Sequence, residues 1–185
     1  MNMQSLFRYA GIAGVISIVT FLLILVLPAM AGNTSSGLIM SLYAVNLLTS
    51  LVSLFVLFLI HRSESPMLSM VAFAATTASS LLSFGADFTN PASPLMLTVT
   101  ILYALAALLY GWLGMRSARL PRGIGVTALV VGGIAALSAA AALAGAIELA
   151  GMLLMVANLA WVAWFVWLSY YFLTSKPLAN AAAQG

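Results

Sequence analysis

The sequence is almost without charge and entirely without cysteine. Only 5% of its 185 residues are charged, with six Lys or Arg and three Asp or Glu, whereas soluble domains carry about 25%. The missing cysteines exclude disulfides, thiolate nucleophiles and cysteine-ligated metals. Hydrophobic residues make up 64% of the chain and the mean hydropathy is +1.18. We therefore expect lipid rather than water to be the solvent of this protein.

Catalytic and metal-binding patterns are also missing. His61 is the one histidine, and no His or acidic pair stands at metal-ligand spacing, so no metal site or haem is expected. Phosphate-binding loops are absent, and Ser83-Phe84-Gly85-Ala86 is no nucleophile elbow. The six basic residues are too dispersed for a nucleic-acid patch. We expect a protein that is not an enzyme, has no cofactor and binds no nucleic acid.

Long apolar segments divide the chain into six predicted membrane spans. A span needs about 20 apolar residues, and the segments cover about 9–30, 38–60, 67–85, 95–115, 124–146 and 149–173. The last two come from one stretch with a single charge, Glu148, which as one helix would measure about 75 Å. The chain must therefore fold back near Glu148, between Gly145 and Gly151. This predicts an all-α bundle, residues 1–185, as one transmembrane domain.

The first segment could also be a cleaved signal peptide, because Ala29-Met30-Ala31 resembles a signal-peptidase site. Its apolar run before Pro28 is about 18 residues long, against 7–15 in a signal peptide. We therefore expect it to be retained as a span.

The charges predict the orientation of the six spans. With Arg8 in the cytoplasm, alternation puts all other basic residues on the same side, together with Glu64, and puts Asp87 and Glu148 outside. This distribution follows the positive-inside rule. Both termini, including Lys176, are therefore predicted to be cytoplasmic. No Asp, Glu, Lys or Arg lies mid-span, which argues against an ion-coupled transporter.

Small residues indicate where helices pack closely. Gly11 with Gly14, and Gly111 with Gly114, are expected at helix contacts, because close approach drives association in lipid. A longer stripe with a four-residue repeat, on the fifth span, is expected to do the same; it consists of Gly132, Ala136, Ala140 and Ala144.

Polar residues follow one face of the second span and one face of the third. They are Asn46, Thr49, Ser50 and Ser53, and Ser69, Thr76, Ser80 and Ser83. One interpretation is hydrogen bonding between helices. The other is a path for a small neutral solute between the two spans, with candidate residues Asn46, Thr49, Ser50, Ser53, Thr76 and Ser80.

Aromatic residues crowd the sixth span. Trp161 lies near the expected bilayer centre, with Asn158 one turn before it and Trp164 after it. They either pack against the bundle or form a wall for an apolar ligand such as a lipid, a quinone or a pigment. His61, with Arg62 and Glu64, is interpreted as a solvated cluster at a helix end.

Two short motifs carry a resemblance. Arg8-Tyr9-Ala10-Gly11-Ile12-Ala13-Gly14, and Leu120-Pro121-Arg122-Gly123-Ile124-Gly125 with the Trp-rich last helix, resemble uncharacterised bacterial multi-pass membrane proteins that carry a six- or seven-span domain of unknown function. The resemblance implies a multi-pass protein of the bacterial cytoplasmic (inner) membrane and no catalytic residue.

Two functions follow as hypotheses. The first is a non-enzymatic membrane component, either an accessory or scaffolding subunit or a binder of an apolar ligand. The alternative is a passive channel or facilitator for a small neutral solute. The expected partners are the lipid bilayer and, among proteins, other membrane subunits or further copies of the chain.

Overall fold

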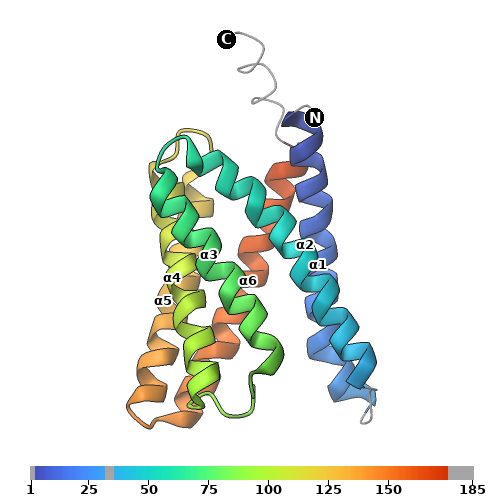
Figure 1. Cartoon of the computed structure of the whole chain (residues 1–185), viewed down its shortest axis with the longest axis vertical. Coiled ribbons are helices and arrows are strands. Elements are labelled where there is room, and N and C mark those ends of the chain that lie inside the picture. Colours follow the sequence, from blue (N-terminus) through green and yellow to red (C-terminus); the bar gives the residue numbers. More distant parts are fainter. Residues whose placement is uncertain (1–2, 32–35, 175–185) are drawn as a thin grey trace. The chain divides into compact units, whose positions relative to one another are not determined.

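The chain forms six long α-helices in a computed structural model that describes residues 3–31 and 36–174 (Figure 1). In chain order these are α1 (Met3–Ala31), α2 (Ser36–Arg62), α3 (Pro66–Leu82), α4 (Pro94–Arg116), α5 (Arg122–Leu143) and α6 (Ile147–Thr174), with a short 3₁₀ helix, η1 (Ser83–Gly85), after α3. The described residues contain no strand. The all-α prediction is therefore confirmed.

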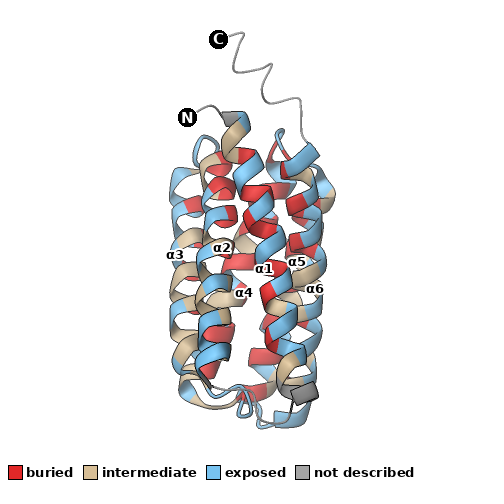
Figure 2. Cartoon of the chain, turned by 90° about the vertical axis from the view of Figure 1, so that its right-hand side faces the viewer, coloured by how far each residue is buried: buried red, intermediate tan, exposed pale blue. Residues whose placement is uncertain are grey.

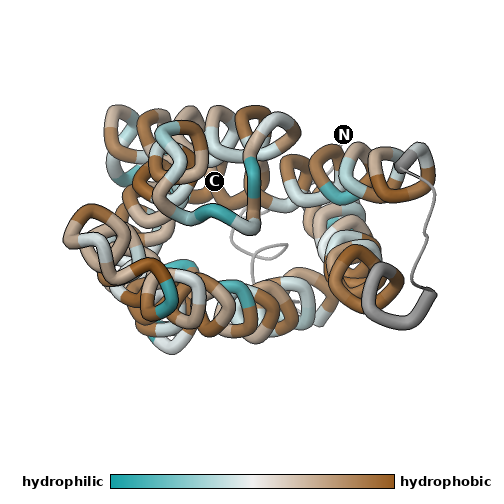
Figure 3. The backbone as a smooth tube through the Cα atoms, turned by 90° about the horizontal axis from the view of Figure 1, so that it is seen from below, coloured by the Kyte–Doolittle hydropathy of each residue, from teal (hydrophilic) through white to brown (hydrophobic). Residues whose placement is uncertain are grey.

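All six helices are long enough and apolar enough to cross a membrane. Seen from below, hydrophobic positions (brown) predominate over strongly hydrophilic ones (teal) in the backbone (Figure 3). Large side chains such as Leu48, Leu137 and Met155 are exposed, on surfaces that lipid would cover. The predicted turn between the first two spans covers 32–37; residues 32–35 and the predicted tail with Lys176 lie outside the described residues, whereas Ser36 and Gly37 already belong to α2.

The helix ends differ from the predicted spans by a few residues. The helix α2 continues through His61 and Arg62, where we expected the span to have ended. The helix α3 stops at Leu82 and the chain tightens into η1, so the third segment is α-helical over fewer residues than predicted. The helix α5 ends at Leu143, three residues earlier than expected.

The chain reverses between α5 and α6 at a helix cap closed by two backbone hydrogen bonds. Gly145 has a positive φ of 79°, a conformation that glycine adopts without steric cost. Its N–H donates to Ala142 O at 3.1 Å, and Ala146 N–H donates to Ala141 O at 2.9 Å, which is the Schellman pattern. Glu148 follows, exposed, in the first turn of α6, where the helix dipole favours a carboxylate. The predicted fold-back is confirmed.

The described residues belong to two compact units. The first unit takes Met1–Leu57 and Phe165–Gly185, and the second takes Phe58–Trp164. Within each helix, buried and exposed residues alternate along the axis, as the red and pale blue bands of α1 show (Figure 2). The prediction of one domain stays a prediction.

In the first unit, two glycines of α1 bring its backbone close to α6. A Cβ on Gly11 would lie 2.6 Å from Leu173 Cγ, and a Cβ on Gly14 would collide with the Ser169 hydroxyl. One turn away, the Phe7 and Phe172 rings are 5.4 Å apart. The expected helix contact at Gly11 and Gly14 is present.

In the second unit, α3, α4 and α5 lie side by side (Figure 1). The α4–α5 contact is the tighter of the two, because glycines of both helices meet. A Cβ on Gly125 would lie 2.6 Å from Met115 N and 2.8 Å from Gly114 C, and a Cβ on Gly132 would lie 2.8 Å from Leu108 N. Gly111 stands against Leu129 in the same way. The expected contact at Gly111 and Gly114 is present.

The predicted stripe on α5 is wrong beyond its first residue. Gly132 is buried, but Ala136, Ala140 and Ala144 are exposed. A four-residue step turns about 40° past a full circle, so such a stripe winds off the contact face. A seven-residue step drifts by only about 20°, and the buried small residues follow it, as Gly125, Gly132 and Ala139 on one line and Ala128, Ala135 and Ala142 on another.

Candidate functional site

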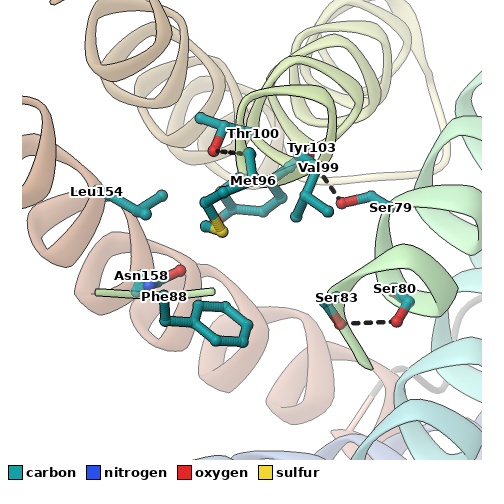
Figure 4. A pocket seen from close by; sticks show the side chains of 10 residues that line it. All are labelled: Ser79, Ser80, Ser83, Phe88, Met96, Val99, Thr100, Tyr103, Leu154 and Asn158. Carbon is teal, nitrogen blue, oxygen red and sulfur yellow. Dashed lines mark hydrogen bonds between the residues drawn. The ribbon is translucent and has the colours of Figure 1, made fainter. Parts of the chain in front are cut away.

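The second unit contains a pocket between α3, α4 and α6, with a cavity volume of about 130 Å³ (Figure 4). A cavity of about 150 Å³ can hold a benzene ring, so the pocket has room for a group of roughly that size. Its walls come from α3, η1, the loop before α4, α4 itself and α6. They consist of Ser79, Ser80, Ser83, Phe88, Met96, Val99, Thr100, Tyr103, Leu154 and Asn158.

The α4 wall is one face of a helix. Met96, Val99, Thr100 and Tyr103 stand at i, i+3, i+4 and i+7, which places them on one side. The Thr100 hydroxyl donates to Met96 O at 2.9 Å within the helix. The Tyr103 hydroxyl donates across to Ala157 O of α6 at 3.3 Å. This bond ties α4 to α6 beside the pocket.

The serine wall comes from the end of α3 and from η1. The Ser79 hydroxyl donates to Val99 O of α4 at 2.9 Å and is buried. The Ser83 hydroxyl donates to Ser80 O at 2.7 Å (Figure 4). The Ser80 hydroxyl has no hydrogen-bond partner among the described residues.

The α6 wall consists of Leu154 and, one turn later, Asn158. Among the described residues, no group forms a hydrogen bond with the Asn158 side chain, which is drawn with the other lining residues in Figure 4. Asn158 is half-buried, and its amide offers two N–H donors and an acceptor oxygen. Among the described residues that line the pocket, it therefore has the largest unused hydrogen-bonding capacity.

The pocket lining carries no ionisable acid or base apart from the tyrosine hydroxyl. The nearest carboxylate in sequence is Asp87, outside the helices. Asp87 Oδ1 accepts from Thr89 Oγ1 at 2.6 Å and from Thr89 N at 2.9 Å. These bonds hold the pKa of Asp87 below its usual value and fix the backbone next to Phe88.

Of the predicted apolar-ligand wall, only Asn158 lines the pocket. Trp161 is half-buried and Trp164 is buried, and neither is among the lining residues. The Trp164 ring packs 6.4 Å from the Tyr110 ring. The walls of this pocket therefore contain aliphatic side chains, a phenyl ring, a phenol and hydroxyl groups, but no indole.

Of the predicted solute path, only Ser80 lines the pocket. On α2, the Asn46 side chain donates to Ser17 O at 2.7 Å and to Ser17 Oγ at 3.1 Å. The Ser53 hydroxyl donates to Ala10 O at 2.7 Å. These α2 donors are thus directed to α1, whereas we expected them to face the third span.

The remaining residues of the path bond within their own helices. Thr49 donates to Val45 O at 2.7 Å, Ser50 to Leu47 O at 2.9 Å and Thr76 to Ala72 O at 2.9 Å, and Ser69 does the same with Pro66 O. Such back-bonds satisfy a hydroxyl without any partner helix. The hydrogens of these hydroxyls therefore need no acceptor from a solute or from water.

Sequence reasoning missed most of the lining residues, namely Ser79, Phe88, Met96, Val99, Thr100, Tyr103 and Leu154. Four of these are ordinary apolar residues, and nothing in the sequence separates a pocket wall from a packed face. A usable signal existed on α4, where Thr100 and Tyr103 interrupt an apolar face at i and i+3.

The interpretation of His61 as solvated is wrong. Its ring is fully buried and packs 6.4 Å from the Tyr110 ring, because α2 continues as helix through this position. His61 Nδ1 lies 3.5 Å from Glu64 Oε2. Glu64 Oε1 accepts from the Ser117 hydroxyl at 2.7 Å. Glu64 therefore links the end of α2 to the loop between α4 and α5.

No group of three or more potential metal ligands occurs among the described residues. Comparisons of the chain with known protein families, curated proteins and solved structures found no match. Any function must therefore be argued from the geometry of the pocket.

Proposed function

We propose that this chain is a non-enzymatic integral membrane protein that binds a small, uncharged, mostly apolar ligand in the α3–α4–α6 pocket. The observation that carries the proposal is the Asn158 amide, which has no hydrogen-bond partner among the described residues and lines a pocket whose apolar walls include Phe88, Met96 and Leu154. Pockets with an apolar lining and a few polar groups are typical of ligand sites. A ligand oxygen or N–H would supply the missing hydrogen bond.

The proposed setting is the bacterial cytoplasmic membrane, with both termini in the cytoplasm. The Arg116–Arg122 loop then faces the cytoplasm, in line with the positive-inside rule. The pocket, near the other end of α4, would open in the outer half of the bilayer. An accessory or scaffolding role, with other subunits or further copies of the chain, is compatible with such a ligand site.

Filling the pocket tests the function. The protein is placed in nanodiscs, and binding of fluorobenzene and 4-fluoroacetophenone is followed by ¹⁹F NMR line broadening. Ser83→Phe adds a ring where only about 130 Å³ is free and should reduce the binding of both probes at least tenfold. Leu159→Phe adds the same ring at an exposed position of α6 and should leave binding unchanged.

Equal binding of the probes by wild type and Ser83→Phe would refute the proposed function. Asn158→Leu separates the polar contribution, since leucine nearly matches asparagine in volume. It should weaken binding of the ketone 4-fluoroacetophenone severalfold while fluorobenzene binds as before.

A passive facilitator for a neutral solute is the second candidate. The favouring observation is that Ser80 and Asn158, both with unused hydrogen-bonding groups, line one uncharged pocket. Liposomes with the protein should then swell faster in glycerol or urea than empty liposomes, and Ser83→Phe should abolish the difference. Equal swelling rates would remove this candidate.

The orientation is tested with introduced cysteines, since the native chain has none. Asn90→Cys and Ala118→Cys both lie at exposed positions. Ala118 is preferable to Ser117, which is buried and bonded to Glu64. An impermeant thiol reagent added to intact cells should label position 90 and spare position 118. The reverse pattern would overturn the proposed orientation.

A further inference from the structure

We infer that the ligand of the α3–α4–α6 pocket carries a neutral hydroxyl group, which it donates to the oxygens of the pocket wall. This inference rests on the proposed function and specifies its ligand class. The argument depends on where the hydrogens of the wall's own hydroxyl groups point.

Of the five hydroxyl groups that line the pocket, four donate their hydrogens to backbone carbonyl oxygens of the protein. Ser79 and Ser83 donate to Val99 O and Ser80 O. Thr100 and Tyr103 donate to Met96 O and Ala157 O. A hydroxyl oxygen that has donated keeps lone pairs and can still accept. Towards a ligand, these four groups are therefore acceptors only.

Donors are scarcer in the pocket. Among the described residues, the Ser80 hydroxyl and the Asn158 amide are the lining side chains with unused N–H or O–H groups. Both also offer an acceptor oxygen. The pocket thus presents six acceptor oxygens and two donor groups.

This imbalance selects among ligand classes. Quinones, ketones and ethers only accept hydrogen bonds, so they can use the donors of Ser80 and Asn158 but none of the acceptor oxygens. A carboxylate, a phosphate or an ammonium would be buried without a counter-charge, which is costly. A hydroxyl group both donates and accepts, so it matches the wall.

Two sources could supply such a group. One is a free small alcohol, since the cavity volume is near that of a benzene-sized guest. The other is the hydroxyl-bearing head of a neutral glyceride whose acyl chain stays in the lipid. Both share the chemistry of an uncharged aliphatic hydroxyl.

A matched pair of probes tests the inference. In nanodiscs, 4-fluorobenzyl alcohol should bind about tenfold more tightly than 4-fluoroacetophenone, which corresponds to about one net hydrogen bond. Their ring is the same, but only the alcohol donates. Affinities are compared at equal membrane concentration, because the two probes partition differently.

Two variants identify the oxygens involved. Ser83→Ala removes an acceptor at the pocket and should reduce the alcohol-to-ketone affinity ratio severalfold. Ser41→Ala removes a hydroxyl with the same kind of back-bond, to Gly37 O at 2.9 Å, on an exposed part of α2, and should leave the ratio unchanged. The wild-type ratio does not depend on the folding of any variant.

The outcomes separate this inference from the proposed function. If both probes bind equally, the pocket binds ligands but the hydroxyl assignment is overturned. If neither probe binds, the proposed function fails with it. Competition then distinguishes the sources: displacement of 4-fluorobenzyl alcohol by glycerol indicates a free alcohol, and displacement by monooleoylglycerol indicates a glyceride. Displacement by neither would contradict the assignment.

Discussion

The two sides of α4 differ in how tightly they pack against their neighbours. Towards α5, Gly111 and Gly114 meet Gly125, and any added Cβ would lie under 3 Å from a neighbouring atom. Towards α3 and α6, the face that includes Met96 and Tyr103 borders a cavity of about 130 Å³. One side is closed to a single methyl group, whereas the other leaves room for a ring.

This difference shows which side is available for function. In lipid, helices associate through close packing, and unfilled space forfeits van der Waals contacts. The α4–α5 contact is closely packed and therefore gains van der Waals contacts along its length. The pocket forfeits part of these contacts, and no described residue bonds to the Asn158 side chain, which is the pattern expected where local stability yields to a ligand site.

The largest effect on stability is expected when a side chain is added at the close α4–α5 contact. Gly125→Ala should destabilise the protein by about 2–3 kcal/mol, as in an overpacked core, because its Cβ would meet backbone atoms that cannot rotate away. Gly133→Ala, on the same helix, is the control: its Cβ meets nothing within 4 Å, so it should be neutral or stabilise by up to about 1 kcal/mol. Unfolding free energies in bicelles measure both, and equal effects would show that the contact is not tight.

A smaller effect is expected from the bond that ties the pocket side together. Ser79→Ala removes the donor to Val99 O and should destabilise by about 0.6–1.7 kcal/mol, the range for hydrogen bonds between membrane helices. Thr76→Val is the matched control, because Thr76 bonds only within its own helix. A loss at Thr76 as large as that at Ser79 would mean that α3 and α4 are not linked by this bond.

The smallest effect concerns pH at the pocket end of α4. The bonds from Thr89 lower the pKa of Asp87 in the folded state, so Asp87 contributes stability above its unfolded pKa, near 3.8. That contribution is lost as the pH falls through the folded pKa. Because Asp87 is exposed, the effect should be slight. Thermal midpoints between pH 6 and pH 3 should fall less steeply in Thr89→Val than in wild type, and an unchanged slope would contradict the assigned cause.

The sequence predicted the parts of the fold that depend on single dominant forces. Hydropathy and length located six helices, and the cost of burying Glu148 located the reversal that Gly145 makes. Charge placement predicts the orientation, which stays a prediction. The stripe at Ala136, Ala140 and Ala144 was wrong because a repeat was matched without following its drift around the helix.

The pocket could not be predicted as a whole, for a physical reason. A serine or threonine hydroxyl can bond to a neighbouring helix, bond back within its own helix or line a pocket, depending on where its hydrogen points. On α3, Ser79, Thr76 and Ser80 show these three outcomes in turn. Asn46 and Asn158 differ in the same way: Asn46 is bonded to Ser17, whereas Asn158 has no hydrogen-bond partner in the described part of the chain. The side chains compared carry the same functional groups, so only the neighbouring helix decides which hydrogen bonds they form.

The short cap at Gly145 also has a consequence for how the chain would enter a bilayer. Only residues 144–146 separate α5 from α6, and their backbone bonds are closed within the cap itself. The two helices would therefore insert together as a hairpin, since neither can cross without drawing the other along. With the orientation proposed above, the part of this hairpin that crosses to the outer side is one small turn with a single carboxylate, Glu148.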